Sequence, residues 1–261
     1  MEKEVQTDVT KNIENIETQR IEPTQLEVVQ NDALTIEEIE TGLVYNGSMV
    51  RVADISEEFR KVIEPILRMY NAAMNVTTAR IEIIKDESRY KNMRCPVHHI
   101  DTRLKSAGSI LGKLQKKNLD LTIGAACNNI YDIAGVRIVC PYIKDVYFIR
   151  DRILAQDDIE VMKVKDYIEH PKENGYRSYH LIIRVPVFFM SKKQMVPVEI
   201  QIRTMAMDLW ASLEHDISYK AINSKGEYQG DYSEFREELT ECSRLIYEAE
   251  EKMERMNSML E

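Results

Sequence analysis

Apolar residues recur along the chain at two spacings, and the longer spacing predicts helices. From about Asp54, apolar side chains fall three and four positions apart, which predicts an amphipathic helix packed on a core. Asp54 and Glu57 have the spacing of a capping box, and Pro65 predicts an interruption with a kink. Two further helices are predicted over about 106–117 and 143–155.

The shorter spacing, with apolar residues at every second position, predicts strands. Residues 131–142, 158–166 and 178–189 are rich in apolar and β-branched side chains, as is typical of a sheet. Residues 194–204 alternate strictly, with Val198, Ile200 and Ile202 on one side and Glu199, Gln201 and Arg203 on the other. Together these segments predict an α+β fold, a mixed sheet flanked by helices, with long helices at the N- and C-terminal ends of the folded part.

Two helices are predicted beyond the last strand. The first should carry Met207, Trp210, Leu213 and Ile217 towards Tyr219 and Lys220. The second has a heptad seam made of Phe235, Leu239, Cys242, Ile246, Ala249, Met253, Met256 and Leu260. This seam fits packing on the helix that begins near Asp54 and fits a contact between subunits equally well.

The acidic charge of the chain is concentrated at one end. The net charge is −9, yet residues 1–50 alone carry eleven Asp or Glu and three Lys or Arg, so the remainder is nearly neutral. We expect an acidic, disordered tail over 1–50, a folded domain over 51–230 and a heptad-patterned helix over 231–261. The folded part can therefore carry a basic face that suits phosphorylated ligands or RNA.

Composition argues against several classes of protein. No apolar run approaches the ~20 residues of a membrane span, and the N-terminus lacks the apolar core of a secretion signal. The cysteines show no CxxC pairing, which indicates reduced thiols, a cytoplasmic protein and no zinc site; they are Cys95, Cys127, Cys140 and Cys242. His98 and His99 are adjacent, so they cannot share one helix face as metal ligands.

Polar side chains that suit a nucleotide gather in the loop from Lys165 to His180. Its cations can pair with phosphates, and the ring of Tyr176 can stack on a base. A second group precedes it, because Arg103, Lys105, Ser109 and Lys113 follow a loop that opens into a helix, where an anion can bind. In both places a solvated surface remains the plain alternative.

Two carboxylates stand next to apolar strands. Asp132 borders the strand predicted over 131–142, where a helix cap, an ion pair or a divalent metal would explain it. Glu199 and Gln201 share one face and can reach a single ligand. In a regular strand Asp132 and Arg137 would lie on opposite faces, so we expect either a bulge at Gly135 or a strand that starts after Asp132.

Five stretches, in order and spacing, resemble the (p)ppGpp synthetase domain of the RelA/SpoT family, and specifically the stand-alone small alarmone synthetases. They are TRLKSAGSILGKL, YDIAGVRIVCPY, KDYIEHPKENGYRSYHLII, VEIQIRTMAMDLWASLEH and DISYK, and they span residues 102–220. The resemblance implies a nucleotidyltransferase-like fold. It also implies transfer of the β,γ-pyrophosphate of ATP to the 3′-hydroxyl of GTP or GDP, which releases AMP.

The resemblance also implies a role for each candidate residue. Asp132 and Glu199 would bind Mg²⁺, and Glu199, with Gln201 beside it, would orient or deprotonate the 3′-hydroxyl. GTP or GDP would be held by Lys165, Lys172, Asn174, Tyr176, His180 and Gln201, with Tyr176 stacked on guanine. Arg103 and Arg137 would sandwich adenine, while Lys105, Ser109 and Lys113 would hold the phosphates of ATP.

The family further implies a homotetramer formed through terminal helices and regulation by (p)ppGpp or single-stranded RNA. A single His-Asp dipeptide, His215-Asp216, lies inside the synthetase match, so we expect no hydrolase domain and no degradation of the product. Two other classes remain as alternatives: a catalytically inactive nucleotide- or RNA-binding regulator on the same fold, and a scaffold organised by the terminal heptads.

Overall fold

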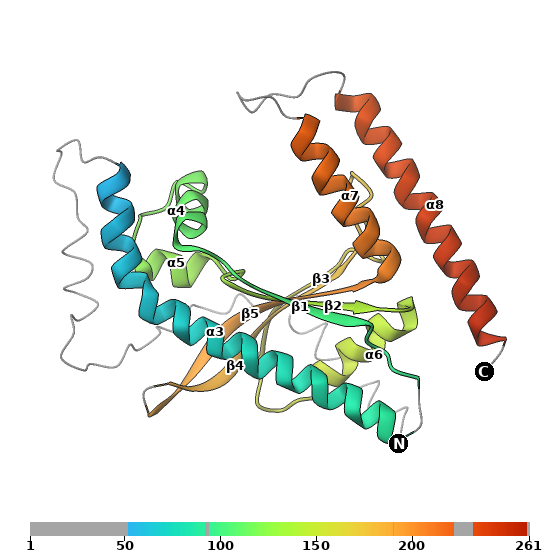
Figure 1. Cartoon of the computed structure of the whole chain (residues 1–261), viewed down its shortest axis with the longest axis horizontal. Helices are drawn as coiled ribbons and strands as arrows, with labels where there is room; N and C mark the ends of the chain where they lie inside the picture. Colours follow the sequence, from blue (N-terminus) through green and yellow to red (C-terminus); the bar gives the residue numbers. More distant parts are fainter. Residues whose placement is uncertain (1–51, 92–93, 190, 222–231, 260–261) are drawn as a thin grey trace.

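The computed structural model describes residues 52–91, 94–189, 191–221 and 232–259 (Figure 1). The predicted acidic tail and the predicted domain limit near residue 230 lie outside these ranges. None of the helices within them combines the length and apolar character that a membrane crossing demands.

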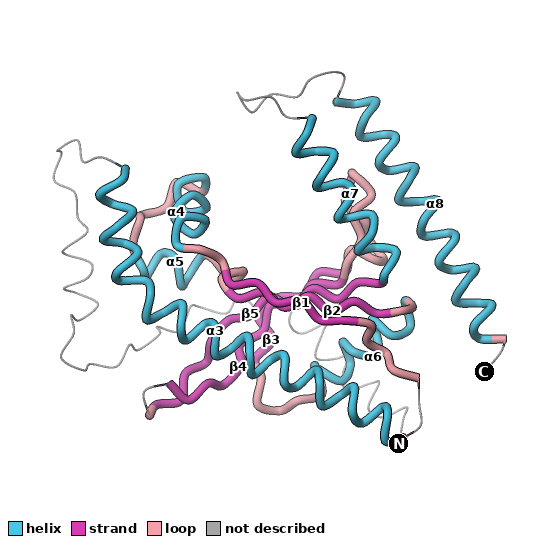
Figure 2. Tube along the Cα trace, in the orientation of Figure 1, coloured by secondary structure: helices cyan, strands magenta, loops and turns pink. Residues whose placement is uncertain are grey.

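A five-stranded mixed sheet forms the centre of the molecule (Figure 2). In spatial order its strands are β1 (His99–Leu104), β2 (Ala134–Cys140), β5 (Lys192–Thr204), β4 (Tyr179–Phe189) and β3 (Glu160–Asp166). The central pair, β2 and β5, is parallel, and every other pair is antiparallel. The α+β architecture predicted from the sequence is confirmed.

The two faces of the sheet differ in character because side chains alternate along each strand. One face is apolar and packs against α3 (Val52–Tyr90) and α6 (Ile143–Leu154), which lie on the same side of the sheet in Figure 1. Its buried side chains include Val136, Ile138, Val198, Ile200 and Ile202. The opposite face carries most of the polar side chains of the strands and is free for chemistry.

Four further helices stand around the polar face. They are α4 (Ala107–Lys116), α5 (Ile123–Asn129), α7 (Met205–Ala221) and α8 (Tyr232–Ser258). In Figure 1, α4 and α5 stand at one end, and α7 and α8 at the other. The indole Nε1 of Trp210 on α7 donates to the carbonyl of Leu239 on α8 at 3.1 Å, which ties these two helices together.

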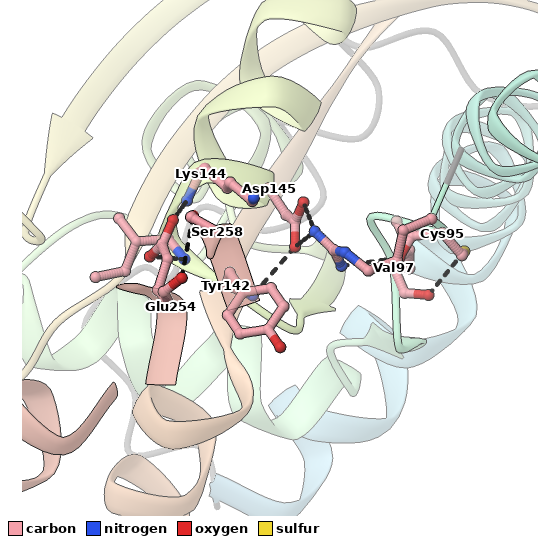
Figure 3. A network of polar contacts seen from close by, with 9 residues as sticks. Cys95, Val97, Tyr142, Lys144, Asp145, Glu254 and Ser258 are labelled. Atoms are coloured by element: carbon pink, nitrogen blue, oxygen red, sulfur yellow. Dashed lines mark hydrogen bonds and ion pairs between the residues drawn. The ribbon is translucent and has the colours of Figure 1, made fainter. Parts of the chain in front are cut away.

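The last turns of α8 are anchored to the start of α6 (Figure 3). The Glu254 carboxylate accepts the backbone N–H groups of Ile143 and Lys144, each at 3.2 Å. A carboxylate at this position satisfies free N–H groups of the helix and complements its dipole. Beside it, Asp145 accepts the N–H of Tyr142 and pairs with Arg94. The position of α8 is thus fixed at two places, by α7 at Leu239 and by α6 at Glu254.

Most predicted elements are present with limits shifted by a few residues. The helix predicted over 106–117 is α4, capped by the Ser106 hydroxyl, which accepts the N–H of Ser109. The helix over 143–155 is α6, and the strands over 158–166, 178–189 and 194–204 are β3, β4 and β5. As predicted, Val198, Ile200 and Ile202 are fully buried.

Three predictions about the elements are wrong. The helix α3 continues through Pro65, so the predicted interruption is wrong, and its first described residue, Val52, lies two positions before Asp54. The segment around Arg103 is not a loop but the edge strand β1. The strand predicted over 131–142 begins only at Ala134, so Asp132 lies in the preceding turn. The alternation of side chains between the two faces of a strand therefore does not apply to Asp132. This last difference explains how Asp132 and Arg137 can serve one site.

The predicted apolar pattern of the last two helices is only partly buried. On α7, Met207 and Trp210 are buried, but Leu213 and Ile217 are 51% and 43% exposed. On α8, the side that faces the body carries Ser243 and Glu250, and the heptad seam is divided: Phe235, Leu239 and Ile246 are half-buried, with Ile246 near Trp210, while its other described members are exposed. Its members Met253 and Met256 are more than half exposed, and Cys242 is exposed as well. The seam therefore does not pack on α3, and Leu260 lies outside the described residues.

Candidate active site

The register of the sheet places the predicted polar residues in two adjacent rows on one face. The first row crosses four strands as Arg137, Gln201, His180 and Lys165, each the direct neighbour of the next. The second row crosses all five strands as Arg103, Gly135, Glu199, Ile182 and Lys163. Residues that are far apart in the chain are thus brought onto a single surface.

A pocket of about 280 Å³ opens over the β5 to β3 side of these rows. Its lining comprises Lys113, Lys117, Asn129, Tyr131, Asp132, Lys163, Lys165, His180, Ile182 and Glu199. Both predicted metal-binding carboxylates line it, together with four lysine side chains. This mixture suits a phosphate chain, since ammonium groups balance its charge and carboxylates can share a cation with it.

Asp132 sits between two lysines at the base of α4. Its Oδ2 lies 2.6 Å from Lys113 Nζ and 3.2 Å from Lys105 Nζ. Burial raises the pKa of Asp132, but the hydrogen bond and charge of Lys113 and the charge of Lys105 outweigh burial and hold that pKa below its usual range. Asp132 Oδ1 is buried and accepts no hydrogen bond in the described part of the chain. An ionised carboxylate with an unused oxygen is suited to a metal ion.

Glu199 is held by its neighbours on the sheet. Its Oε2 accepts a hydrogen bond from the Gln201 amide at 3.1 Å, and its Oε1 lies 3.5 Å from His180 Nδ1. Burial raises the pKa of Glu199, whereas His180 and Gln201 lower it more strongly, so the net pKa lies below the usual value. The nearby charge of Asp132 raises it slightly, as expected for two acids that share a pocket.

This pair of carboxylates fits Mg²⁺ better than a metal with many protein ligands. Within the residues that the structure describes, no group of three or more His, Cys, Asp or Glu side chains converges. Mg²⁺ commonly takes one or two carboxylates and completes its shell with water and substrate phosphates. The unused Oδ1 of Asp132 and the ionised Glu199 supply that donor set.

The loop between β3 and β4 carries Tyr176 beside the pocket. Asn174 Oδ1 accepts the N–H of Tyr176 at 3.2 Å, so this side chain shapes the loop. Gly175 has a φ of 84° and its carbonyl accepts the Ser243 hydroxyl of α8 at 2.5 Å. A Cβ on Gly175 would come within 2.6 Å of Ser243 Cβ, so only glycine fits both the backbone conformation and the contact.

The Tyr176 ring is surrounded by cations and held through its hydroxyl. Lys172 Nζ lies 4.4 Å and Arg203 Cζ 5.1 Å from the ring centroid. Arg203 Nη2 donates to the Tyr176 hydroxyl at 2.6 Å, and that hydroxyl is 2.9 Å from His180 Nε2. Because Arg203 can only donate, the Tyr176 proton is free to be donated to His180. The ring is therefore positioned before any base stacks on it.

The structure adds two functional candidates, Arg203 and Asp208, to which the sequence alone assigned no role in the site. Arg203 shares the polar side of β5 with Glu199 and Gln201, so the alternation of the strand already pointed to it. Asp208 on α7 pairs with both Arg203 and Arg137, at 3.2 and 3.3 Å. No local pattern pointed to Asp208, since its partners come from two strands. Arg103 lies diagonally across from Arg137 on the same face of the sheet.

Comparison with known proteins agrees with this geometry. The family described as "Region found in RelA / SpoT proteins" matches residues 102–224. GTP pyrophosphokinase YwaC of Bacillus subtilis (strain 168) is 40% identical over 187 residues, which cover 72% of this chain and 86% of that protein. GTP pyrophosphokinase YjbM of the same strain is 36% identical over 157 residues, or 60% of this chain and 73% of that protein.

Solved structures show the same fold. Small alarmone synthetase 1 from Bacillus subtilis, bound to its product pppGpp, superposes with a TM-score of 0.66 at 28% identity, covering 78% of this chain and 98% of that one. Small alarmone synthetase 2 from the same organism gives a TM-score of 0.64 at 39% identity, covering 74% and 97%.

A mixed sheet with two carboxylates among lysine and arginine side chains fits a transferase that acts on phosphorylated substrates, which is the class of its relatives. The chain belongs to the RelA/SpoT family, within the small alarmone synthetases, whose curated relatives are GTP pyrophosphokinases. The resemblance drawn from the five sequence stretches is thereby confirmed.

Proposed function

We propose that this protein transfers the β,γ-pyrophosphate of ATP to the 3′-hydroxyl of GTP or GDP, giving pppGpp or ppGpp and AMP. The observation that carries the proposal is that Asp132 and Glu199, from separate parts of the chain, line one pocket together with four lysines. Curated relatives named GTP pyrophosphokinases and a structural neighbour bound to pppGpp support the same reaction.

The two nucleotides occupy opposite ends of the polar rows in this proposal. ATP lies towards β1 and α4, with adenine between Arg103 and Arg137 and its phosphates on Lys105, Ser109 and Lys113. The guanine nucleotide lies towards β3 and the loop, where Tyr176 stacks on guanine and Lys165, Lys172 and His180 hold phosphates. Its 3′-hydroxyl then meets the β-phosphate of ATP near Glu199 and Asp132.

The chemistry is mainly one of positioning and charge balance. Mg²⁺, when bound by Asp132 and Glu199, supplies positive charge to the phosphates that are transferred. The pKa of Glu199 lies below its usual value, so this carboxylate is ionised at neutral pH and a weak base. Its role is therefore to accept the hydrogen bond of the 3′-hydroxyl and orient it, which suffices for a loose phosphoryl transition state. The Gln201 amide keeps the Glu199 carboxylate in place.

The reaction itself is tested with the purified full chain. Incubation with ATP, GTP and Mg²⁺ should yield AMP and pppGpp in equal amounts, resolved by anion-exchange chromatography, and EDTA should stop it. A protein that binds both nucleotides but forms neither product would instead be the inactive regulator considered above.

Replacing Tyr176 by alanine should weaken the guanine nucleotide selectively. A base stacked on an aromatic ring is worth ~1–3 kcal/mol, so the KM for GTP should rise by roughly 5- to 150-fold while the KM for ATP stays nearly constant. Tyr176→Phe is the matched control, because it keeps the ring and removes only the contacts with His180 and Arg203. An equal loss for ATP and GTP after Tyr176→Ala would contradict the stacking role.

The outer side of α7 and α8 supports a proposal of self-association. Large apolar side chains exposed there are Leu209, Leu213, Ile217, Leu245, Met253, Met256 and Met259. Several large exposed apolar side chains on two packed helices are typical of an interface. We expect Met253→Lys with Met256→Lys to lower the mass measured by sedimentation; an unchanged mass would remove the seam from the interface.

A further inference from the structure

One oxygen atom of Asp208 contacts an arginine from each of the two proposed nucleotide pockets. It lies in the first turn of α7, directly after β5. Its Oδ1 accepts a hydrogen bond from Arg203 Nη1 at 3.2 Å and forms an ion pair with Arg137 Nη1 at 3.3 Å. The Asp208 side chain is 18% exposed and that of Arg203 only 7%.

Sharing one carboxylate oxygen makes the two arginines depend on each other. Arg137 and Arg203 lie on the same face of neighbouring strands, offset by two residues, so their positive charges are close. Asp208 is the ion-pair partner of both within the part of the chain that the structure describes. The Nε of each guanidinium is buried without an acceptor there, so the shared Asp208 oxygen is the contact that links the two groups.

Arg203 carries the connection on to the acceptor side. Its Nη2 donates to the Tyr176 hydroxyl at 2.6 Å and to Gln201 Oε1 at 3.0 Å. Gln201 in turn donates to Glu199. A single buried guanidinium thus fixes the proposed guanine-stacking ring and the amide that orients the proposed catalytic carboxylate. Arg137, at the other side of Asp208, belongs to the proposed adenine pocket.

We propose that Asp208 is a positioning residue that couples the binding of ATP to the binding of the guanine nucleotide. Adenine stacked on Arg137 fixes that guanidinium, which fixes the Asp208 carboxylate and so holds Arg203 against Tyr176 and Gln201. Each nucleotide then meets a site that the other has already ordered. This inference rests on the proposed function, because it takes Arg137 and Tyr176 as the contacts to adenine and guanine.

Coupling of this kind is measured by binding alone, with no turnover. The dissociation constant of GDP is determined calorimetrically on the full chain, with and without saturating α,β-methylene-ATP and Mg²⁺. In the unaltered protein the ATP analogue should tighten GDP roughly 5- to 150-fold, the usual range for coupled sites, and GDP should tighten the analogue by the same factor. In Asp208→Asn this ratio should fall to about one, although each nucleotide still binds.

Two further variants keep the test decisive if Asp208→Asn folds poorly. Asp208→Glu retains the negative charge and should retain most of the coupling. Arg203→Lys keeps a cation beside Asp208 but cannot reach Asp208, Tyr176 and Gln201 together, so it should lose the coupling. Asp158→Asn is the control, since Asp158 pairs with Arg80 outside the pocket and should leave the ratio unchanged.

The outcomes separate this inference from the reaction. A ratio of one in the unaltered protein, or an undiminished ratio in both Asp208→Asn and Arg203→Lys, would overturn the role of Asp208 while leaving the proposed activity intact. Failure of the unaltered protein to bind either nucleotide would instead overturn the proposed function.

Discussion

Turnover should fall by roughly 10²- to 10⁴-fold when Glu199 is replaced by glutamine, because this change removes the carboxylate that orients the attacking hydroxyl. Glutamine has nearly the same shape, so the packing of β5 is preserved, although its single amide oxygen can accept from only one of Gln201 and His180. Binding of GDP and of α,β-methylene-ATP should therefore stay within a few-fold of the unaltered protein. The rate of AMP formation at saturating ATP, GTP and Mg²⁺ gives the comparison.

A matched control for this variant is Glu160→Gln. Glu160 is an exposed carboxylate at the start of β3 that pairs with Arg184 and does not line the pocket. Its loss should leave turnover unchanged. If Glu199→Gln turned over as fast as Glu160→Gln, Glu199 would have no part in the reaction, and the proposed orientation of the hydroxyl would be wrong.

Replacing Glu250 by glutamine should stabilise the fold at alkaline pH. Glu250 lies on α8, where it lines a small cavity together with Gly175 and Arg177 of the loop between β3 and β4. It is 6% exposed, and both its oxygens are buried. The pKa of Glu250 is raised to about 7: burial is the main cause and the charges of Glu254 and Glu251 add to it, whereas the Thr204 side chain and the charge of Arg177 oppose them. Arg177 itself stacks on Tyr247, which is also on α8.

The sign of the pH dependence follows from proton binding. Between the ordinary glutamate pKa of 4.5 and the folded value of about 7, folded Glu250 holds a proton that the unfolded chain releases. The Glu250 contribution to the free energy of unfolding therefore decreases as pH rises through this window and stays low above it. Glutamine carries no charge at any pH. The variant should exceed the unaltered protein by up to about 3 kcal/mol at pH 8 and by less than about 1 kcal/mol near pH 5.

Urea unfolding at both pH values measures this difference. Glu237→Gln, at an exposed position of the same helix, should change stability little at either pH. A gain from Glu250→Gln that is equal at pH 5 and pH 8 would show that removal of the buried charge is not its cause.

Strand periodicity predicted the central features of the site because sheet geometry obeys a local rule. The alternation in β5 correctly placed Glu199 and Gln201 on the polar face and three apolar residues in the core. The parity conflict between Asp132 and Arg137 left two explanations, a bulge at Gly135 or a strand that begins after Asp132, and the second applies because β2 begins at Ala134. Both inferences needed only the positions of neighbouring residues.

Features set by distant contacts could not be predicted in this way. The edge strand β1 is polar and short, and pairing with β2 decides its conformation rather than its own sequence. The heptad seam of α8 was a true periodic pattern, yet periodicity does not say which partner covers a helix. The role of Asp208 depends on strands that meet only in the folded protein.

The parallel pairing of β2 with β5 has a consequence for biosynthesis. β5 lies between β2 and β4 in the sheet. The backbone edges of β2 and β4 that pair with β5 therefore stay open until synthesis has passed Thr204 and β5 has left the ribosome. A nascent chain halted before β5 exposes Ala134–Cys140 as an open strand edge, which is prone to associate with other chains. The proposed magnesium-binding pair and the closed interior of the sheet are therefore completed in the same late step of synthesis.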